Sequence, residues 1–128
     1  KGALDRRRRE LVATVVSAAN RCDYCVRHHA EALRAHLKDE AAVGQIAADY
    51  TQAPLDPADR ALCDFAVKLT RAPDRMEEGD VLALREAGWD DRAVLHLTLV
   101  VGYFNFVNRV ALGLGVPFNE DEVKGYTY

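Results

Sequence analysis

The stretch Asn20-Arg21-Cys22-Asp23-Tyr24-Cys25-Val26-Arg27-His28-His29 lies between two segments with helical patterns of apolar residues. Leu4 to Ala19 carries apolar residues at a helical spacing. Asn20 has the side chain of an N-cap, so we predict a second helix from about Arg21 to Leu37. Almost no linker separates the two helices. The sequence therefore predicts an antiparallel helix hairpin that turns at Asn20.

The rest of the chain continues the helical pattern, and no segment alternates with period two for long enough to form a strand. We predict further helices at Ala41–Tyr50, Asp56–Arg71, Glu77–Ala87 and from Asp90 or Asp91 to about Leu112. The fold class is therefore all-α with about six helices. At 128 residues, the size favours a single domain over residues 1–128. Because Lys1 is not an initiator methionine, we expect the chain to lack some N-terminal residues.

The last predicted helix is apolar almost all round. Polar residues interrupt it at His96, Asn105, Asn108 and Arg109, and its apolar run is short of the ~20 residues of a membrane span, so we expect no membrane. A helix without a polar face is buried on every side, and a small domain cannot easily surround it alone. We therefore expect a homo-oligomer with this helix in its interface, in which a charge at Val107 would split the assembly or stop folding.

The composition excludes several classes of protein. The formal net charge of −3 gives no basic excess for nucleic acid. We interpret the run Arg6-Arg7-Arg8-Arg9 as a solvated helix face or as salt bridges between subunits, rather than as an anion site. Three cysteines are an odd number and do not suggest a secreted disulfide framework. No signal peptide is visible. We therefore expect a cytoplasmic protein.

Two thiols and an imidazole lie close together in the quoted stretch. Cys22 and Cys25 are three residues apart, and His29 follows Cys25 by four residues. On a helix these steps turn about 300° and about 40°, so the three side chains share one face. A nearby imidazole promotes the reactive thiolate, and a second thiol lets an oxidised sulfur form a local disulfide. The spacing therefore predicts a redox site.

Glu10 is a candidate further member of this site. It lies ten residues before Asn20, and His29 lies nine residues after it. At an equal rise per residue, the two side chains reach about the same height in the hairpin. Glu10, Thr14 and Ser17 also follow a helical spacing. If this polar stripe faces the cysteines, Glu10 can hold the imidazole of His29 and fix its tautomer.

The string Glu10-x11-Cys22-x2-Cys25-x3-His29 resembles the signature of alkyl hydroperoxidase D (AhpD-like) proteins in the carboxymuconolactone decarboxylase superfamily. The stretches Asn20–His29 and Phe104–Val116 are similar to its peroxidase-related branch. The likeness runs from Leu4 to about Phe118, and it implies an all-α fold whose core hairpin carries the site, in a trimer or hexamer. One departure is Tyr24, which stands where alkyl hydroperoxidase D itself has a second histidine, so this chain lacks that histidine for a proton relay.

The resemblance implies a thiol-dependent hydroperoxide reductase. Cys25 would attack the peroxide and become a sulfenic acid, and Cys22 would condense with it to a disulfide. His29 would be the base and Glu10 would orient it. An external dithiol, a lipoyl group or a thioredoxin-like protein, would reset the pair, with no bound cofactor. Two alternatives are a redox-sensing or oligomeric binding protein without turnover, and a decarboxylase acting on a small lactone acid, which needs no resolving thiol.

Other uses of a Cys-x-x-Cys pair fit this sequence less well. A zinc site needs a second ligand pair, and only His28, His29 and the remote Cys63 are available, so we expect no metal. A c-type haem needs a histidine where Val26 stands, and a thioredoxin fold needs a strand before the motif. Two inert core cysteines remain an alternative. We interpret Cys63 and His96 as core residues and His28 as a surface residue.

Overall fold

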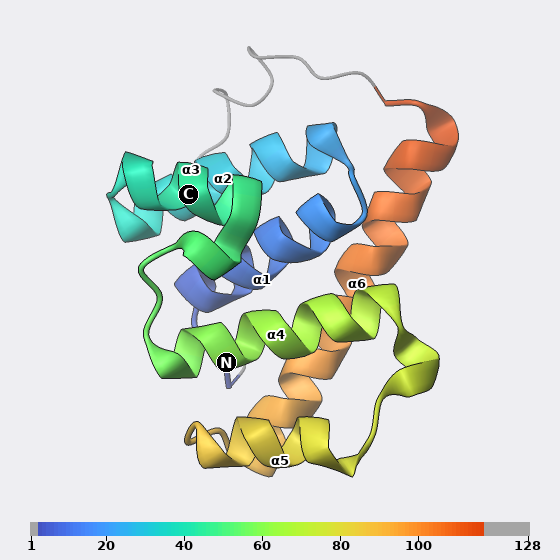
Figure 1. Ribbon diagram of the computed structural model, residues 1–128. Coiled ribbons are helices and arrows are strands. Elements are labelled where there is room, and N and C mark those ends of the chain that lie inside the picture. The colour runs from blue at the N-terminus through green and yellow to red at the C-terminus, as the bar shows by residue number, and fades with distance from the viewer. Residues whose placement is uncertain (1–2, 117–128) are drawn as a thin grey trace.

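The computed structural model describes residues 3–116, and its regular elements are helical (Figure 1). No residue in that range lies in a β-strand, so the all-α prediction is confirmed. Within residues 3–116 the six α-helices are α1 (Arg6–Ala19), α2 (Asp23–Leu37), α3 (Glu40–Asp49), α4 (Pro57–Arg71), α5 (Glu78–Glu86) and α6 (Asp91–Leu114), with 3-10 turns η1 (Tyr50–Gln52) and η2 (Pro73–Arg75).

α1 lies at the centre of the fold, against α2, α3, α4 and α6 (Figure 1). All its residues from 10 to 17 are buried, including Glu10, Thr14 and Ser17. Buried polar groups need hydrogen-bond partners within the protein. Thr14 satisfies its hydroxyl locally, by donating from Oγ1 to the carbonyl of Glu10 at 2.8 Å. Glu10 hydrogen-bonds to His29 of α2, and Ser17 accepts a hydrogen bond from Asn108 of α6.

The turn between α1 and α2 differs from the prediction. Asn20 is the C-cap of α1, and Cys22 is the N-cap residue of α2. Arg21 lies between them in the left-handed region with a φ of 56°, and Cys22 N donates to the carbonyl of Ser17 at 3.0 Å. The prediction that Asn20 caps the second helix is wrong, because reversing the chain takes up Asn20 and Arg21 before α2 begins.

The other predicted helix bounds hold to within a few residues. Asp56 caps α4 and Asp90 caps α6, each accepting a hydrogen bond from a backbone N–H three residues later. α6 continues to Leu114, beyond the predicted end at Leu112. Gly115 closes it with a φ of 65°, a left-handed conformation that glycine adopts without a steric penalty.

α6 buries only one of its faces within the described chain. Ala93, Leu97, Val101, Asn108 and Ala111 are buried against the other helices. The opposite face exposes an apolar stripe, the α6 stripe, which consists of Leu95, Leu99, Tyr103, Phe106, Val110 and Leu114. The domain therefore covers half of a helix whose sequence is apolar all round.

α6 is long and apolar enough to cross a membrane when judged by length and composition alone. Its 24 residues exceed the length that the sequence led us to expect. The core helix of a soluble protein can have the same length and composition. Asn105 and Asn108 hydrogen-bond to the side chains of Thr70, Ser17 and Asn20, so the inner face of α6 packs as a helix of a protein core.

The four consecutive arginines of α1 have different surroundings. Arg7 Nη1 and Arg8 Nε donate to the carboxylate of Asp59 on α4 at 2.8 and 2.7 Å, and Asp59 is only 4% exposed. The side chain of Arg9 forms no hydrogen bond or ion pair with any other described residue. The prediction of a solvated face or of salt bridges between subunits is therefore wrong for Arg7 and Arg8, which are paired within the chain.

Candidate active site

Glu10 of α1 and His29 of α2 are in direct contact across the hairpin. Glu10 Oε2 lies 2.9 Å from His29 Nδ1, and Arg6 Nε donates to Glu10 Oε1 at 3.1 Å. Glu10 is only 7% exposed, and each of its two carboxylate oxygens has a hydrogen-bond partner within the protein. The equal heights that the sequence predicted for Glu10 and His29 are confirmed by this contact.

The charge on Glu10 determines which nitrogen of His29 carries a proton. Burial raises the pKa of Glu10, but the hydrogen bond to His29 and the charge of Arg6 lower it more, so this pKa lies below its ordinary value. Glu10 is therefore a carboxylate near neutral pH and accepts a hydrogen bond. His29 must donate that bond from Nδ1, which leaves Nε2 of the neutral ring as a base.

Cys22 and Cys25 form a disulfide, with their Cα atoms 5.2 Å apart. Cys25 lies in the first turn of α2, and Cys22 stands just outside the helix at the N-cap. Both are buried and pack against Ala111 of α6. The first turn of a helix favours a thiolate through its free amides and dipole, and Cys25 occupies that position.

A pocket of about 300 Å³ lies beside Cys25. Its lining residues come from α1, α2 and α6: Arg6, Glu10, Tyr24, Cys25, His28, His29, Ala32 and Val107. Three of the four predicted site residues, Glu10, Cys25 and His29, thus reach one cavity, which we call the cysteine pocket. Cys22 is joined to it through the disulfide. Among residues 3–116, no three His, Cys, Asp or Glu side chains are placed to hold a metal ion.

One residue of the cysteine pocket lies elsewhere than predicted. His28 was expected at the surface but is half-buried, because the ring of Tyr24 covers it with ring centroids 4.3 Å apart. Val107, for which the sequence predicts a place in a subunit interface, also lines the cysteine pocket. Cys63 is fully buried, as predicted for a core residue. His96 was also predicted in the core but is half-buried, and it accepts a hydrogen bond from Leu4 N at 2.9 Å.

α6 supplies residues near the site whose partners the sequence did not predict. Phe104 packs edge-on against His29, with ring centroids 4.8 Å apart. Asn20 Nδ2 donates to Oδ1 of Asn105 and of Asn108, both at 2.9 Å. The aromatic and amide residues in the stretch Phe104–Val116 were a signal, but only the packing of α6 on α1 reveals their partners.

The helix hairpin and its Glu–Cys–Cys–His arrangement define the class of protein. Residues 1–68 match the carboxymuconolactone decarboxylase family, and the chain belongs to that family. Its fold and its Cys-x-x-Cys pair are those of the AhpD-like members. Among proteins of curated function, none matches this sequence.

Two solved structures from bacteria are similar to almost the whole chain. An uncharacterized peroxidase-related protein from Silicibacter sp. TM1040 is 37% identical with a TM-score of 0.91, and the match covers 94% of this chain and 63% of that one. An uncharacterized peroxidase-related protein with an alkylhydroperoxidase AhpD core, from Ralstonia eutropha JMP134, is 35% identical with a TM-score of 0.89 over 94% and 64%. This chain thus spans less than two thirds of the length of either protein.

A third solved structure extends the fold to another activity. The debrominase Bmp8 is 17% identical with a TM-score of 0.79, over 94% of this chain and 67% of that one. At this identity the likeness concerns the fold alone. Members of one helical fold therefore differ in their chemistry, and the function of this chain has to be argued from its own site.

Proposed function

We propose that this protein is a thiol-dependent peroxidase that reduces hydroperoxides with its Cys22–Cys25 pair. The observation that carries the proposal is the meeting of Cys25, His29 and Glu10 in one pocket, next to a second cysteine within disulfide distance. A base, a group that orients the base, a nucleophile and a resolving thiol are the parts that this reaction needs. The peroxidase-related proteins from Silicibacter and Ralstonia support the same class.

The reaction divides into three balanced steps. His29 Nε2 takes the proton of Cys25, and the thiolate attacks one peroxide oxygen, so the O–O bond breaks and the alkoxide that leaves takes the proton back from His29 to become an alcohol. Cys25 is then a sulfenic acid. The Cys22 thiol attacks that sulfur, which releases water and forms the disulfide. An external dithiol exchanges with the disulfide, is itself oxidised, and restores both thiols.

The partners of this reaction are a hydroperoxide and a dithiol, either a lipoyl group or a thioredoxin-like protein, and no bound cofactor takes part. A cytoplasmic location would keep the pair reduced between turnovers. We further propose a homo-oligomer, a trimer or hexamer, in which a second copy covers the part of the α6 stripe at Phe106, Val110 and Leu114. Single exposed apolar residues are ordinary on a protein surface, but this row follows one helix face over its whole length.

Turnover tests the peroxidase proposal directly. Reduced protein mixed with tert-butyl hydroperoxide and dihydrolipoamide should consume the two in equal amounts over many cycles. Cys25→Ser should consume neither, whereas Cys63→Ser, which changes a buried thiol outside the cysteine pocket, should retain turnover. Loss of two thiols per chain without further turnover would instead indicate a redox sensor. Peroxide consumption that persists in Cys25→Ser would refute the proposal.

A further inference from the structure

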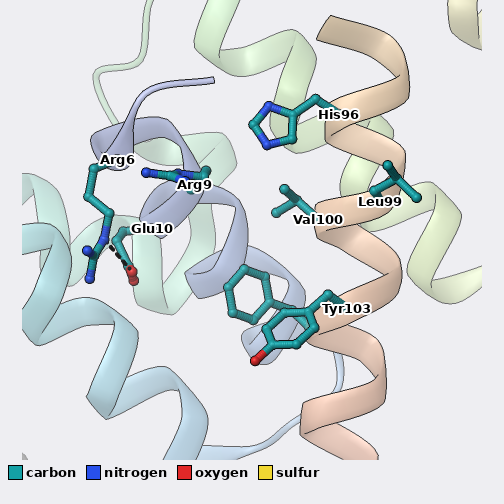
Figure 2. Close-up of a pocket in the computed structure, with 8 residues that line it drawn as sticks. Arg6, Arg9, Glu10, His96, Leu99, Val100 and Tyr103 are labelled. Atoms are coloured by element: carbon teal, nitrogen blue, oxygen red, sulfur yellow. Dashed lines mark hydrogen bonds and ion pairs between the residues drawn. The ribbon is translucent and has the colours of Figure 1, made fainter. Parts of the chain in front are cut away.

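A second pocket opens between α1 and α6 on the other side of Glu10. Its volume is about 430 Å³, and it is lined by Arg6, Arg9, Glu10, His96, Leu99, Val100, Tyr103 and Phe104. Figure 2 shows Arg9 on α1 and His96 on α6 on two sides of this pocket. Arg6 and Glu10 line both this pocket and the cysteine pocket. We call it the arginine pocket.

Arg9 gives the arginine pocket a positive charge without a partner. Its Nε atom is buried and forms no hydrogen bond with any described residue, although a buried donor without an acceptor is costly. The neighbouring carboxylate does not fill this role, because Arg6 and His29 each occupy one oxygen of Glu10. A ligand with an acceptor atom would give Arg9 Nε the hydrogen-bond partner that the described residues do not supply.

His96 adds a second donor to the arginine pocket. Its Nδ1 accepts the hydrogen bond from Leu4 N at 2.9 Å, so the proton of the neutral ring is on Nε2. Burial, followed by the positive charges of Arg9 and Arg92, lowers the pKa of His96 below its ordinary value. The pocket thus offers one guanidinium and one imidazole N–H in a positive field, a combination suited to a carboxylate.

The remaining wall of the arginine pocket is apolar and leads toward the cysteines. Leu99, Val100, Tyr103 and Phe104 follow His96 along the same side of α6, and Val107 of the cysteine pocket comes next. From His96 to Val107 the helix rises about 16 Å at ~1.5 Å per residue. An apolar chain of that length with a carboxylate at one end would fit this site. The carboxylate would bind Arg9 and His96, and the chain would pack against the apolar wall.

We propose that Arg9 and His96 bind the carboxylate of a fatty-acid hydroperoxide, whose chain lies along α6 and whose peroxide group reaches Cys25. This inference rests on the proposed peroxidase function for the identity of the reacting group. The carboxylate site itself concerns binding alone, and it makes Arg9 a residue that determines substrate specificity. It also assigns to one residue of the arginine run an anion-binding role that the sequence pattern did not predict.

Binding of decanoate to the oxidised protein tests the site without any turnover. Calorimetric titration should show that decanoate binds at least about tenfold more tightly than decanol, which has the same chain without the charge. Arg9→Met should weaken decanoate binding about tenfold or more, and Arg9→Lys should retain part of the affinity. Arg75→Met removes an exposed arginine that lines neither pocket, and it should bind as wild type does.

Kinetics test the link to the reaction. In wild type, kcat/KM for linoleic acid hydroperoxide should exceed that for its methyl ester, and Arg9→Met should reduce this ratio about tenfold, mainly through KM. Equal decanoate affinity in wild type and Arg9→Met, or no decanoate binding at all, would overturn the proposal. The proposal would also be overturned if Arg9→Met left the ratio of the two kcat/KM values unchanged and raised KM for the dithiol instead. If neither hydroperoxide is reduced, the peroxidase function fails, and the titration still decides the carboxylate site.

Discussion

Asn108 donates a hydrogen bond from Nδ2 to Ser17 Oγ at 3.1 Å, and neither residue has exposed surface. The carbonyl of Ser17 in turn accepts from Cys22 N at 3.0 Å. A buried amide on α6 therefore holds the end of α1 from which the chain turns into the cysteine pair. The geometry of the redox pair is thus coupled to the position of α6.

Replacing Asn108 by alanine should lower the free energy of unfolding by about 2 kcal/mol, because Ser17 and Asn20 lose a buried hydrogen-bond partner. Urea unfolding measures the change. Gln52→Ala alters an exposed amide in η1 and should stay within about 0.5 kcal/mol of wild type. Equal stability of the two variants would show that the buried network contributes nothing net.

The two cysteines should differ in their first reaction with peroxide. Cys25 lines the pocket that holds His29, whereas Cys22 does not line it. We therefore expect Cys25→Ser to lose the reaction, and Cys22→Ser to react once and remain a sulfenic acid. Stopped-flow oxidation with sulfenic acid trapping measures both. If Cys22→Ser is the variant that fails to react, the roles of the two sulfurs are reversed.

His29→Ala and Glu10→Gln should both raise the pKa of the Cys25 thiol in the reduced protein and slow its oxidation. The effect of His29→Ala should be the larger, roughly 100-fold, because it removes the base itself. Glu10→Gln leaves the base in place but weakens its orientation. The pH dependence of thiol alkylation gives the pKa in each variant. A Glu10→Gln defect larger than that of His29→Ala would contradict the order of roles.

Stability in acid should depend on Glu10. Burial raises its pKa, but the hydrogen bond to His29, the charge of His29 and the charge of Arg6 together outweigh burial and bring this pKa below the ordinary 4.5. A depressed folded-state pKa stabilises the protein fully above the unfolded value, and this contribution disappears as pH falls through the folded value. The advantage of wild type over Glu10→Gln in urea unfolding should therefore shrink below pH 4.5. A difference that stays constant with pH would exclude this linkage.

The α6 stripe should control assembly. Phe106 is 64% exposed in the middle of it, so Phe106→Asp should place a charge in the subunit interface and shift sedimentation toward the monomer. Thr51→Asp, at an exposed position in η1, serves as the control and should leave the assembly intact. A wild-type protein that sediments as a monomer at micromolar concentration would rule out the homo-oligomer.

The hairpin and the Glu10–His29 contact were predictable because they depend on local rules. A short turn fixes two antiparallel helices, and an equal rise per residue then sets the heights of side chains on both sides. The start of α4 was predictable for a similar reason, since Asp56 and Pro57 form a local capping pattern.

Contacts across long stretches of chain were not predictable in this way. Asn20 and Asn108 are 88 residues apart, and their hydrogen bond exists because α6 crosses the end of α1. The arginine run posed the same problem. Arg7 and Arg9 look alike in the sequence, and only the rotation of α1 against α4 decides that Arg7 meets Asp59 while Arg9 faces a pocket.

Trp89 is the only tryptophan in the chain. Its Nε1 donates to the carbonyl of Ala58 at 3.0 Å, and the guanidinium of Arg8 lies 4.8 Å from its ring. One fluorophore therefore reports whether α1, α4 and the segment before α6 are docked together. Because Trp89 lines neither pocket, its emission gives a measure of folding separate from thiol chemistry. In any variant described above, an unreactive protein can thus be distinguished from an unfolded one by its spectrum.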